Sequence, residues 1–266
     1  MLDLYKSASD LMKANKPFAL ATIIESKGST PRHSGKMIVL PDGSIIGTVG
    51  GGLAEKTVID RALAAIKAGR SELVEMKLNS EVENGLAMHC GGALKVFVEV
   101  HMTRPCLVLA GGGHVNQSLY YFALELGYDV MIVEDREAFG NTQRYPEAKA
   151  IFVHEDMLEA MKQVEIEPNM YVVIATKDSD EKALRAVIDS DAAYIGLIGS
   201  RRKVGIVLDH LRADGIDEAL IEKVHSPIGL DIGAETPAEI AISILAEILK
   251  LISAASGRSL KELRTR

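Results

Sequence analysis

Hydrophobic positions in the middle of the chain follow three successive patterns. Residues 106–110 are five consecutive apolar positions, typical of a short buried strand. Residues 114–126 carry apolar side chains at helical spacing, and a second apolar run at 130–133 ends on Glu134 and Asp135. Strand, helix, strand and terminal acid in this order predict a βαβ unit of the dinucleotide-binding type.

The turn between the first strand and the helix is Gly111-Gly112-Gly113, which has the chemistry of a phosphate site. Glycines let a phosphate approach the backbone, the helix N-terminus offers N–H groups, and the two acids after the second strand can accept hydrogen bonds from a ribose. His114 can donate to a phosphate or simply face solvent. Asn116 replaces the third glycine of the fingerprint, so the helix–strand packing or the pyrophosphate groove is expected to differ. An ordinary α/β sheet with a tight turn is the alternative.

Beyond this unit, strand-like and helix-like segments alternate along the sequence. The strand patterns lie at 149–154, 170–175 and 193–198, and the helical ones near 156–163, 178–189 and 201–213. Such alternation predicts an α/β fold with a Rossmann-like, doubly wound parallel sheet. Thr236 and Glu239 fit a capping box that starts a final helix with a wide apolar face.

The first part of the chain has a different pattern, and we expect a separate α+β domain over residues 1–102, followed by the Rossmann-like domain over 103–266. A linker is predicted at 99–105. The local patterns predict strands at 18–25, 71–78 and 93–100, a hairpin of 37–40 with 44–49, and a helix at 53–68 closed by Gly69.

Composition narrows the class of protein. The chain has 266 residues, 47% of them hydrophobic, and a net charge of −7, which disfavours a general nucleic-acid or anionic-membrane binder. Two cysteines do not make a disulfide scaffold. Residues 1–17 form an amphipathic pattern with acids and lysines, unlike a signal peptide, and the apolar run at 240–252 is interrupted by charges. We therefore expect a cytoplasmic protein that contacts neither membrane nor nucleic acid.

A second glycine turn, Gly50-Gly51-Gly52, repeats the strand–glycine–helix order inside the first domain. Successive glycine N–H groups at a helix N-terminus form an anion-binding nest. The preceding loop adds three side chains suited to phosphate, Ser29, Thr30 and Arg32. Two unrelated turns are the alternative, because the sequence does not show whether these loops meet.

Cys90 stands between His89 and the glycines Gly91 and Gly92. The glycines would let a large ligand come close, and nearby dipoles can lower the pKa of a thiol. Cys90 is therefore a candidate nucleophile, sulfur carrier or soft metal ligand, with a small packed side chain as the alternative. Cys106 opens a strand and is predicted to be a packing residue.

A cation-rich turn follows the strand at 193–198. Its residues Ser200, Arg201, Arg202 and Lys203 start a helix, where positive charges oppose the helix dipole. A bound anion would remove that conflict, so the turn is a candidate site for a phosphate or an acidic partner. It also follows a strand at its carboxyl end, where ligands of such folds bind.

Seven segments together resemble the XdhC/CoxI family, the accessory proteins of xanthine dehydrogenase and related molybdenum hydroxylases. The resemblance covers nearly the whole chain. In the first domain it rests on GSTPR, PDGSIIGTVGGG and HCGG, and in the second on GGGHV, VEDR, YIGLIGSRRK and HSPIGLDIGAETPAEIAISILAEI.

The resemblance implies a protein that binds molybdenum cofactor, assists its sulfuration, protects it and delivers it to the apo-hydroxylase. It implies a homodimer, and a cysteine desulfurase is a further candidate partner. By position, Cys90 would contact the cofactor or its sulfur, and it is the candidate molybdenum contact. Arg32 and the first glycine turn would shape a pocket, while the turn Gly111–His114 and Ser200–Lys203 would hold phosphate-bearing parts of the ligand.

Three functions stay open at this point. The first is a cofactor-insertion chaperone, which the resemblance favours over a catalyst. The second is an NAD(P)-dependent oxidoreductase using the Rossmann domain, although the sequence offers no convincing acid–base set beside the glycine turn. The third is a nucleotide-sensing adaptor that contacts the hydroxylase without holding its cofactor.

Overall fold

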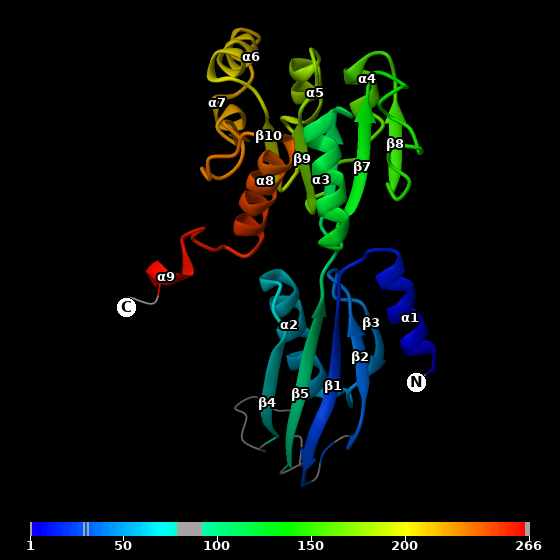
Figure 1. The fold of residues 1–266 in the computed structure, drawn as a ribbon. Coiled ribbons are helices and arrows are strands. Elements are labelled where there is room, and N and C mark those ends of the chain that lie inside the picture. Colours follow the sequence, from blue (N-terminus) through cyan, green and yellow to red (C-terminus); the bar gives the residue numbers. More distant parts are fainter. Residues whose placement is uncertain (1, 29, 31, 79–91, 264–266) are drawn as a thin grey trace. The chain divides into compact units, whose positions relative to one another are not determined.

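A computed structural model describes residues 2–28, 30, 32–78 and 92–263 of the chain (Figure 1). The chain divides into two compact units, Met1–Thr103 and Arg104–Arg266. Each unit has its own sheet and its own hydrophobic core. Among the described residues, the helices are all too short or too polar to span a bilayer.

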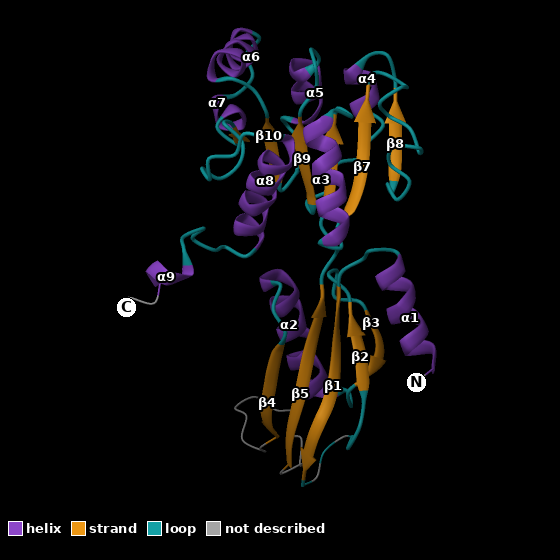
Figure 2. Ribbon diagram, viewed as in Figure 1, coloured by secondary structure: helices purple, strands orange, loops and turns teal. Residues whose placement is uncertain are grey.

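The N-terminal unit is built on a five-stranded antiparallel sheet with the order β3-β2-β1-β5-β4 (Figure 2). The strands are β1 (Phe18–Lys27), β2 (Lys36–Val39), β3 (Ile45–Thr48), β4 (Glu72–Leu78) and β5 (Gly92–His101), and the helices are α1 (Leu2–Lys13) and α2 (Gly52–Ala68). Successive side chains of β1 point to opposite faces. Ala19 and Ala21 pack with α2, whereas Phe18 and Leu20 belong to the cluster with α1.

The local predictions for this unit hold, with one exception. Gly69 ends α2 in the left-handed conformation, with φ of 63°. The predicted linker at 99–105 was wrong in its first part, because β5 continues to His101. Phe18 pairs with His101 in the sheet, and their rings stack at 4.6 Å, which extends the strand.

The C-terminal unit is a six-stranded parallel sheet with the order β11-β10-β9-β6-β7-β8. The strands are β6 (Cys106–Ala110), β7 (Asp129–Glu134), β8 (Ala150–Val153), β9 (Met170–Ile174), β10 (Tyr194–Leu197) and β11 (Val224–His225). The chain runs outward from β6 to β8, then returns to β9 on the other side of β6. The two carboxyl ends that flank this reversal, those of β6 and β9, form the topological switch point of the sheet.

Helices cover both faces of this sheet, as the Rossmann-like prediction requires. They are α3 (His114–Glu125), α4 (Met157–Met161), α5 (Asp180–Val187), α6 (Arg201–Ala213), α7 (Glu218–Ile221) and α8 (Pro237–Ile252). The short helix α9 (Leu260–Leu263) follows them and has no buried residue. Leu107 and Leu109 of β6 pack with α3 and α8, whereas Val108 packs with α4, α5 and α6. The predicted mixed α/β class is confirmed.

The capping box at α8 is also confirmed: Thr236 accepts from Glu239 N at 3.3 Å, and Glu239 accepts from Thr236 N at 2.8 Å. Three elements were not predicted, the short helices α7 and α9 and the sixth strand, β11. A two-residue strand carries no periodicity of its own. It forms because Val224 pairs beside Ile195 of β10.

Candidate functional site

The glycine turn after β6 is shaped by close packing at its first two positions. Gly111 has φ of +101°, and a Cβ there would lie 2.4 Å from the Ala175 carbonyl oxygen. A Cβ on Gly112 would lie 2.4 Å from the Phe139 carbonyl oxygen. Gly113, by contrast, has no atom within 4 Å of a built Cβ, so the turn is open only at the start of α3.

The N-terminus of α3 lacks an internal anion. Gly113 is the N-cap and supplies no side-chain cap, and the first turn of the helix has no acid. The His114 side chain is exposed, and its imidazole forms no hydrogen bond or ion pair with a described residue. The unpaired N–H groups and the helix dipole therefore face open space, which suits a phosphate.

Glu134, one of the acids predicted to meet a ribose, points inward. It is fully buried at the end of β7 and accepts a hydrogen bond from the backbone N–H of Gly112. It also accepts from the backbone N–H of Asp135 and of Arg136, both at 3.1 Å, and from Arg136 Nε at 2.9 Å. The carboxylate thus ties β7 to the glycine turn.

Asn116 occupies the position of the third glycine of the fingerprint and contacts the turn directly. Its side chain is fully buried, and Nδ2 donates to the carbonyl oxygens of Ala110 at 2.9 Å and Gly111 at 2.7 Å. The amide satisfies two carbonyl groups at the end of β6, an interaction that a glycine at this position could not make.

Asp135, the second acid, accepts a hydrogen bond from Ser179 Oγ at 2.5 Å. Ser179 lies after β9, so this bond joins the two loops on either side of β6. Burial raises the pKa of Asp135, but the hydrogen bond from Ser179 and the Arg136 charge act in the opposite direction, and the pKa lies below its ordinary value.

Lys203 is already paired within the unit. Its Nζ lies 2.5 Å from Asp180, a carboxylate that is 3% exposed and also accepts from the backbone and side chain of Thr176. Ser200 caps α6 by accepting from Lys203 N at 3.2 Å. The predicted conflict between this cation and the helix dipole is therefore answered by an internal carboxylate.

Arg201 and Arg202 differ from Lys203. Both are exposed, and neither guanidinium has an ion pair or hydrogen bond with any residue in the described part of the chain. These two guanidinium groups, at the carboxyl edge of the parallel sheet, remain available for an external anion.

The glycine turn of the N-terminal unit holds a carboxylate of its own. Gly50, Gly51 and Gly52 have φ values of 131°, 75° and 65°, which only glycine adopts readily. Glu55 of α2 accepts from the Thr48 hydroxyl, from Val49 N at 3.1 Å and from Gly51 N at 3.2 Å. The hydrogen bond from Thr48, assisted by those from the turn, holds the pKa of Glu55 below its ordinary value.

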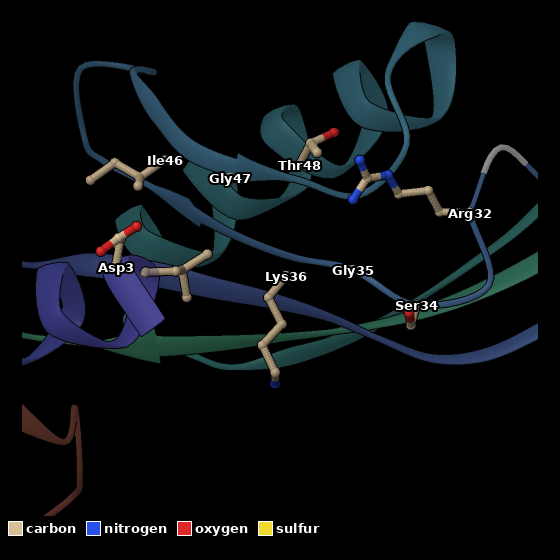
Figure 3. A pocket seen from close by; sticks show the side chains of 9 residues that line it. Asp3, Arg32, Ser34, Gly35, Lys36, Ile46, Gly47 and Thr48 are labelled. Carbon is tan, nitrogen blue, oxygen red and sulfur yellow. The ribbon is translucent and has the colours of Figure 1, made fainter. Parts of the chain in front are cut away.

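The sequence left open whether the loop before β2 meets this turn. In the structure, the described residues 32–36 lie beside the end of β3, but none of the three turn glycines lines the cavity formed there. Lys36 pairs with Thr48 across β2 and β3, and the two segments line a cavity of about 330 Å³. Figure 3 shows the Arg32 guanidinium extending toward Thr48, while Lys36 points away. Arg32 has no ion pair within the described residues, so it can offer its charge to a ligand in this cavity.

The two cysteines fall in different places. Cys90 and Gly91 lie outside the described residues, and so does Ser29; Gly92 begins β5. Cys106 is 1% exposed, and burial raises the pKa of its thiol to about 11, which confirms the predicted packing role. Among the described residues, no cluster of three or more His, Cys, Asp or Glu side chains could hold a metal ion.

Several residues that shape these sites were missed from the sequence, namely Glu55, Thr48, Ser179 and Asp180. For Glu55 a signal existed, because an acid in the first turn of a helix can fold back onto the glycine nest before it. For Ser179 and Asp180 the local sequence does not show the distant partners, Asp135 and Lys203, that place them in the site. Thr48 precedes the glycine turn, and its bond to Glu55 forms only when the chain folds back over that turn.

Two family models match the chain. The model of the XdhC Rossmann domain matches residues 107–248, and that of the XdhC and CoxI family matches residues 11–77. The second unit, a doubly wound parallel sheet with a glycine turn after β6, is thus an XdhC-type Rossmann domain. The chain belongs to the XdhC/CoxI family.

Two curated proteins are similar to the chain. The chain is 41% identical over 256 residues to the uncharacterized protein YqeB of Escherichia coli K12, covering 96% of the chain and 47% of that protein. It is 28% identical over 166 residues to a protein of Bacillus subtilis 168 that is named as a probable xanthine dehydrogenase subunit, covering 61% of the chain and 47% of that protein. The chain therefore spans about half the length of these curated relatives.

A solved structure shares the fold. The crystal structure described as a xanthine dehydrogenase from Bacillus halodurans has a TM-score of 0.52 and 20% identity, covering 94% of this chain and 97% of that one. At this identity the likeness concerns the fold alone.

Proposed function

We propose that this chain is an accessory protein of a xanthine dehydrogenase-type molybdenum hydroxylase. It binds the molybdenum cofactor, assists its sulfuration and hands it to the apo-enzyme. The family assignment of both units supports the role, and the name of the Bacillus subtilis relative supports the client class. A cysteine desulfurase is the proposed sulfur source, and the chain acts in the cytoplasm.

The observation that carries the proposal is the open phosphate-binding edge of the Rossmann unit. The pterin of molybdenum cofactor carries a phosphate or a nucleotide, so it needs N–H groups and cations without internal partners. The N-terminus of α3, Arg201 and Arg202 supply them, and Arg32 offers a further cation beside its cavity. The described residues fit the phosphate-bearing part of the group.

The described residues supply no ligand cluster for molybdenum itself. When bound, the cofactor would provide the oxo-transfer centre of the client enzyme. The chain's own residues would bind and orient its phosphate, and Cys90 remains the proposed contact for cofactor sulfur.

Anaerobic titration with molybdenum cofactor tests the proposal. Pterin retained after gel filtration is oxidised and measured by fluorescence. We expect retention by the wild-type chain, several-fold less by the double variant Arg201→Met/Arg202→Met, and loss of sulfur retention in Cys90→Ala. Cys106→Ala is the matched control, because it removes the other thiol. No retention by the wild-type chain would refute the proposal.

We also propose a homodimer. The α8 side chains Ile242 and Leu249 are 50% and 41% exposed and line an apolar groove with Phe122 and Leu126 of the α3 segment. Light scattering of Ile242→Glu, which should dissociate a dimer that uses this face, tests the arrangement.

A further inference from the structure

We infer that the glycine turn of the Rossmann unit does not take a nicotinamide dinucleotide, because Glu134 holds the turn from within instead of binding a ribose. Glu134 is thus a positioning residue that acts through Gly112. The inference deepens the proposed function and rests on it: the ligand's phosphate binds at the open α3 end of the turn, and no ribose binds beside β7.

The hydrogen-bonding capacity of Glu134 is already used within the chain. An ionised carboxylate offers about four lone-pair sites. Five N–H donors contact Glu134: the backbone of Gly112, Asp135 and Arg136, and Nε and Nη2 of Arg136, the last at 3.3 Å. No acceptor site is left for the two hydroxyls of a ribose.

The space around Glu134 is also closed. Glu134 is 0% exposed, because the segment after β7 folds over it. A Cβ on Gly140 would lie 2.9 Å from Glu134 Cβ, and Gly112 packs against the Phe139 carbonyl. Arg136 lies 4.2 Å from the centre of the Phe139 ring, and Arg144 reaches back to the Gly112 carbonyl at 3.4 Å. The space beside β7 is thus filled by the chain itself.

The neighbouring acid does not take over the ribose. Asp135 is engaged by Ser179 at 2.5 Å and by Arg136 Nε at 3.3 Å. In a doubly wound sheet a dinucleotide crosses the switch point from the β7 side to the β9 side. The Asp135–Ser179 bond joins the loops on these two sides, so a dinucleotide laid across would have to break it.

Calorimetric titration of the full chain with NAD+, NADP+, NADH and ADP-ribose tests the inference. We expect no saturable binding of these ligands at millimolar concentration by the wild-type chain. We expect the same of Ser179→Ala, a variant that removes the hydrogen bond to Asp135 without burying a charge. Binding of any of these ligands by the wild-type chain with a Kd below about 100 µM, roughly −5.5 kcal/mol, would overturn it.

The role of Glu134 is tested separately by unfolding. Six of the seven tyrosines lie beyond residue 103, so tyrosine fluorescence reports on the Rossmann unit. Glu134→Gln should lower the midpoint temperature of thermal unfolding of the Rossmann unit by about 10 °C. The reason is that a buried amide cannot accept hydrogen bonds from all five N–H donors. Glu137→Gln, an exposed acid three positions on, is the matched control and should not move the midpoint. A ribose-binding acid would show the reverse: unchanged stability in Glu134→Gln and lost dinucleotide affinity.

The outcomes separate this inference from the proposed function. Pterin retained without dinucleotide binding supports both. Dinucleotide bound together with pterin overturns the inference alone. Neither ligand bound refutes the proposed function while the inference about Glu134 stands.

Discussion

The two glycine turns of this chain have the same sequence pattern but take their internal carboxylate from different places. In the N-terminal unit Glu55 lies on the helix that follows the turn, and it fills the nest at the start of that helix. In the Rossmann unit Glu134 comes from the next strand, and it engages the side of the turn away from the helix. The N-terminus of α3 consequently stays open, whereas the backbone nest before α2 is occupied.

This difference shows that three glycines between a strand and a helix do not by themselves define an anion site. The origin of the nearest acid decides which N–H groups remain for a ligand. In the N-terminal unit the space for a ligand is accordingly the cavity beside Arg32, not the backbone of the turn.

The largest expected effect concerns the positions within one turn. Gly112→Ala should destabilise the Rossmann unit by about 3 kcal/mol, because its Cβ would meet the Phe139 carbonyl oxygen at 2.4 Å. Gly113→Ala should be nearly neutral, since nothing lies within 4 Å and φ is −76°. Urea unfolding, monitored by tyrosine fluorescence, compares the two variants. Equal losses of stability would contradict the finding that the turn is closely packed at Gly112 and open at Gly113.

A second prediction separates the cations of α6. Lys203→Met leaves the buried Asp180 carboxylate without its cation and should cost about 2 kcal/mol, less than a fully buried pair because Lys203 is 45% exposed. Arg201→Met should change the free energy of unfolding by less than about 0.5 kcal/mol. If Arg201→Met proved the more destabilising, Arg201 would have a structural partner.

A third prediction applies the comparison to the carboxylates. Glu55→Gln should destabilise the N-terminal turn by about 1 kcal/mol, less than the corresponding change at Glu134, because Glu55 is only half-buried. Hydrogen–deuterium exchange should speed up at residues 48–55 and stay unchanged in the β4–β5 pair. Glu75→Gln, an exposed acid on β4, is the control.

The smallest effect is a pH dependence. The pKa of Glu55 is lowered in the folded unit, so its contribution to stability is present above about pH 4.5 and is lost as the pH falls toward the folded pKa. Glu25, Asp42 and Glu72 titrate in the same direction. Glu55→Gln should therefore only partly reduce the loss of unfolding free energy as the pH falls below about 4.5. An unchanged dependence of the unfolding free energy on pH would contradict the lowered pKa of Glu55.

The sequence predicted the elements well wherever periodicity was long. The run at 106–110, the helix after Gly113 and the capping box at Thr236 all appear as expected, because each depends on neighbours in the chain. β11 was missed, since its two residues form a strand only beside β10.

Site chemistry was harder to predict, because it depends on which side chains meet. Local sequence shows that Glu134 follows a strand and that Lys203 starts a helix. It does not show that Gly112 and Asp180, distant in the chain, satisfy them. Arg32, His114, Arg201 and Arg202 form no ion pair with the described residues, so their role in binding a ligand stays a prediction.

The burial of Cys106 has a practical consequence. With a thiol that is 1% exposed and a pKa of about 11, Cys106 holds almost no thiolate at neutral pH. Since the chain has only one other cysteine, rapid alkylation of the native protein would report on Cys90 alone. Labelling at Cys90 can thus be tested in the wild-type sequence, without removing Cys106 from the core.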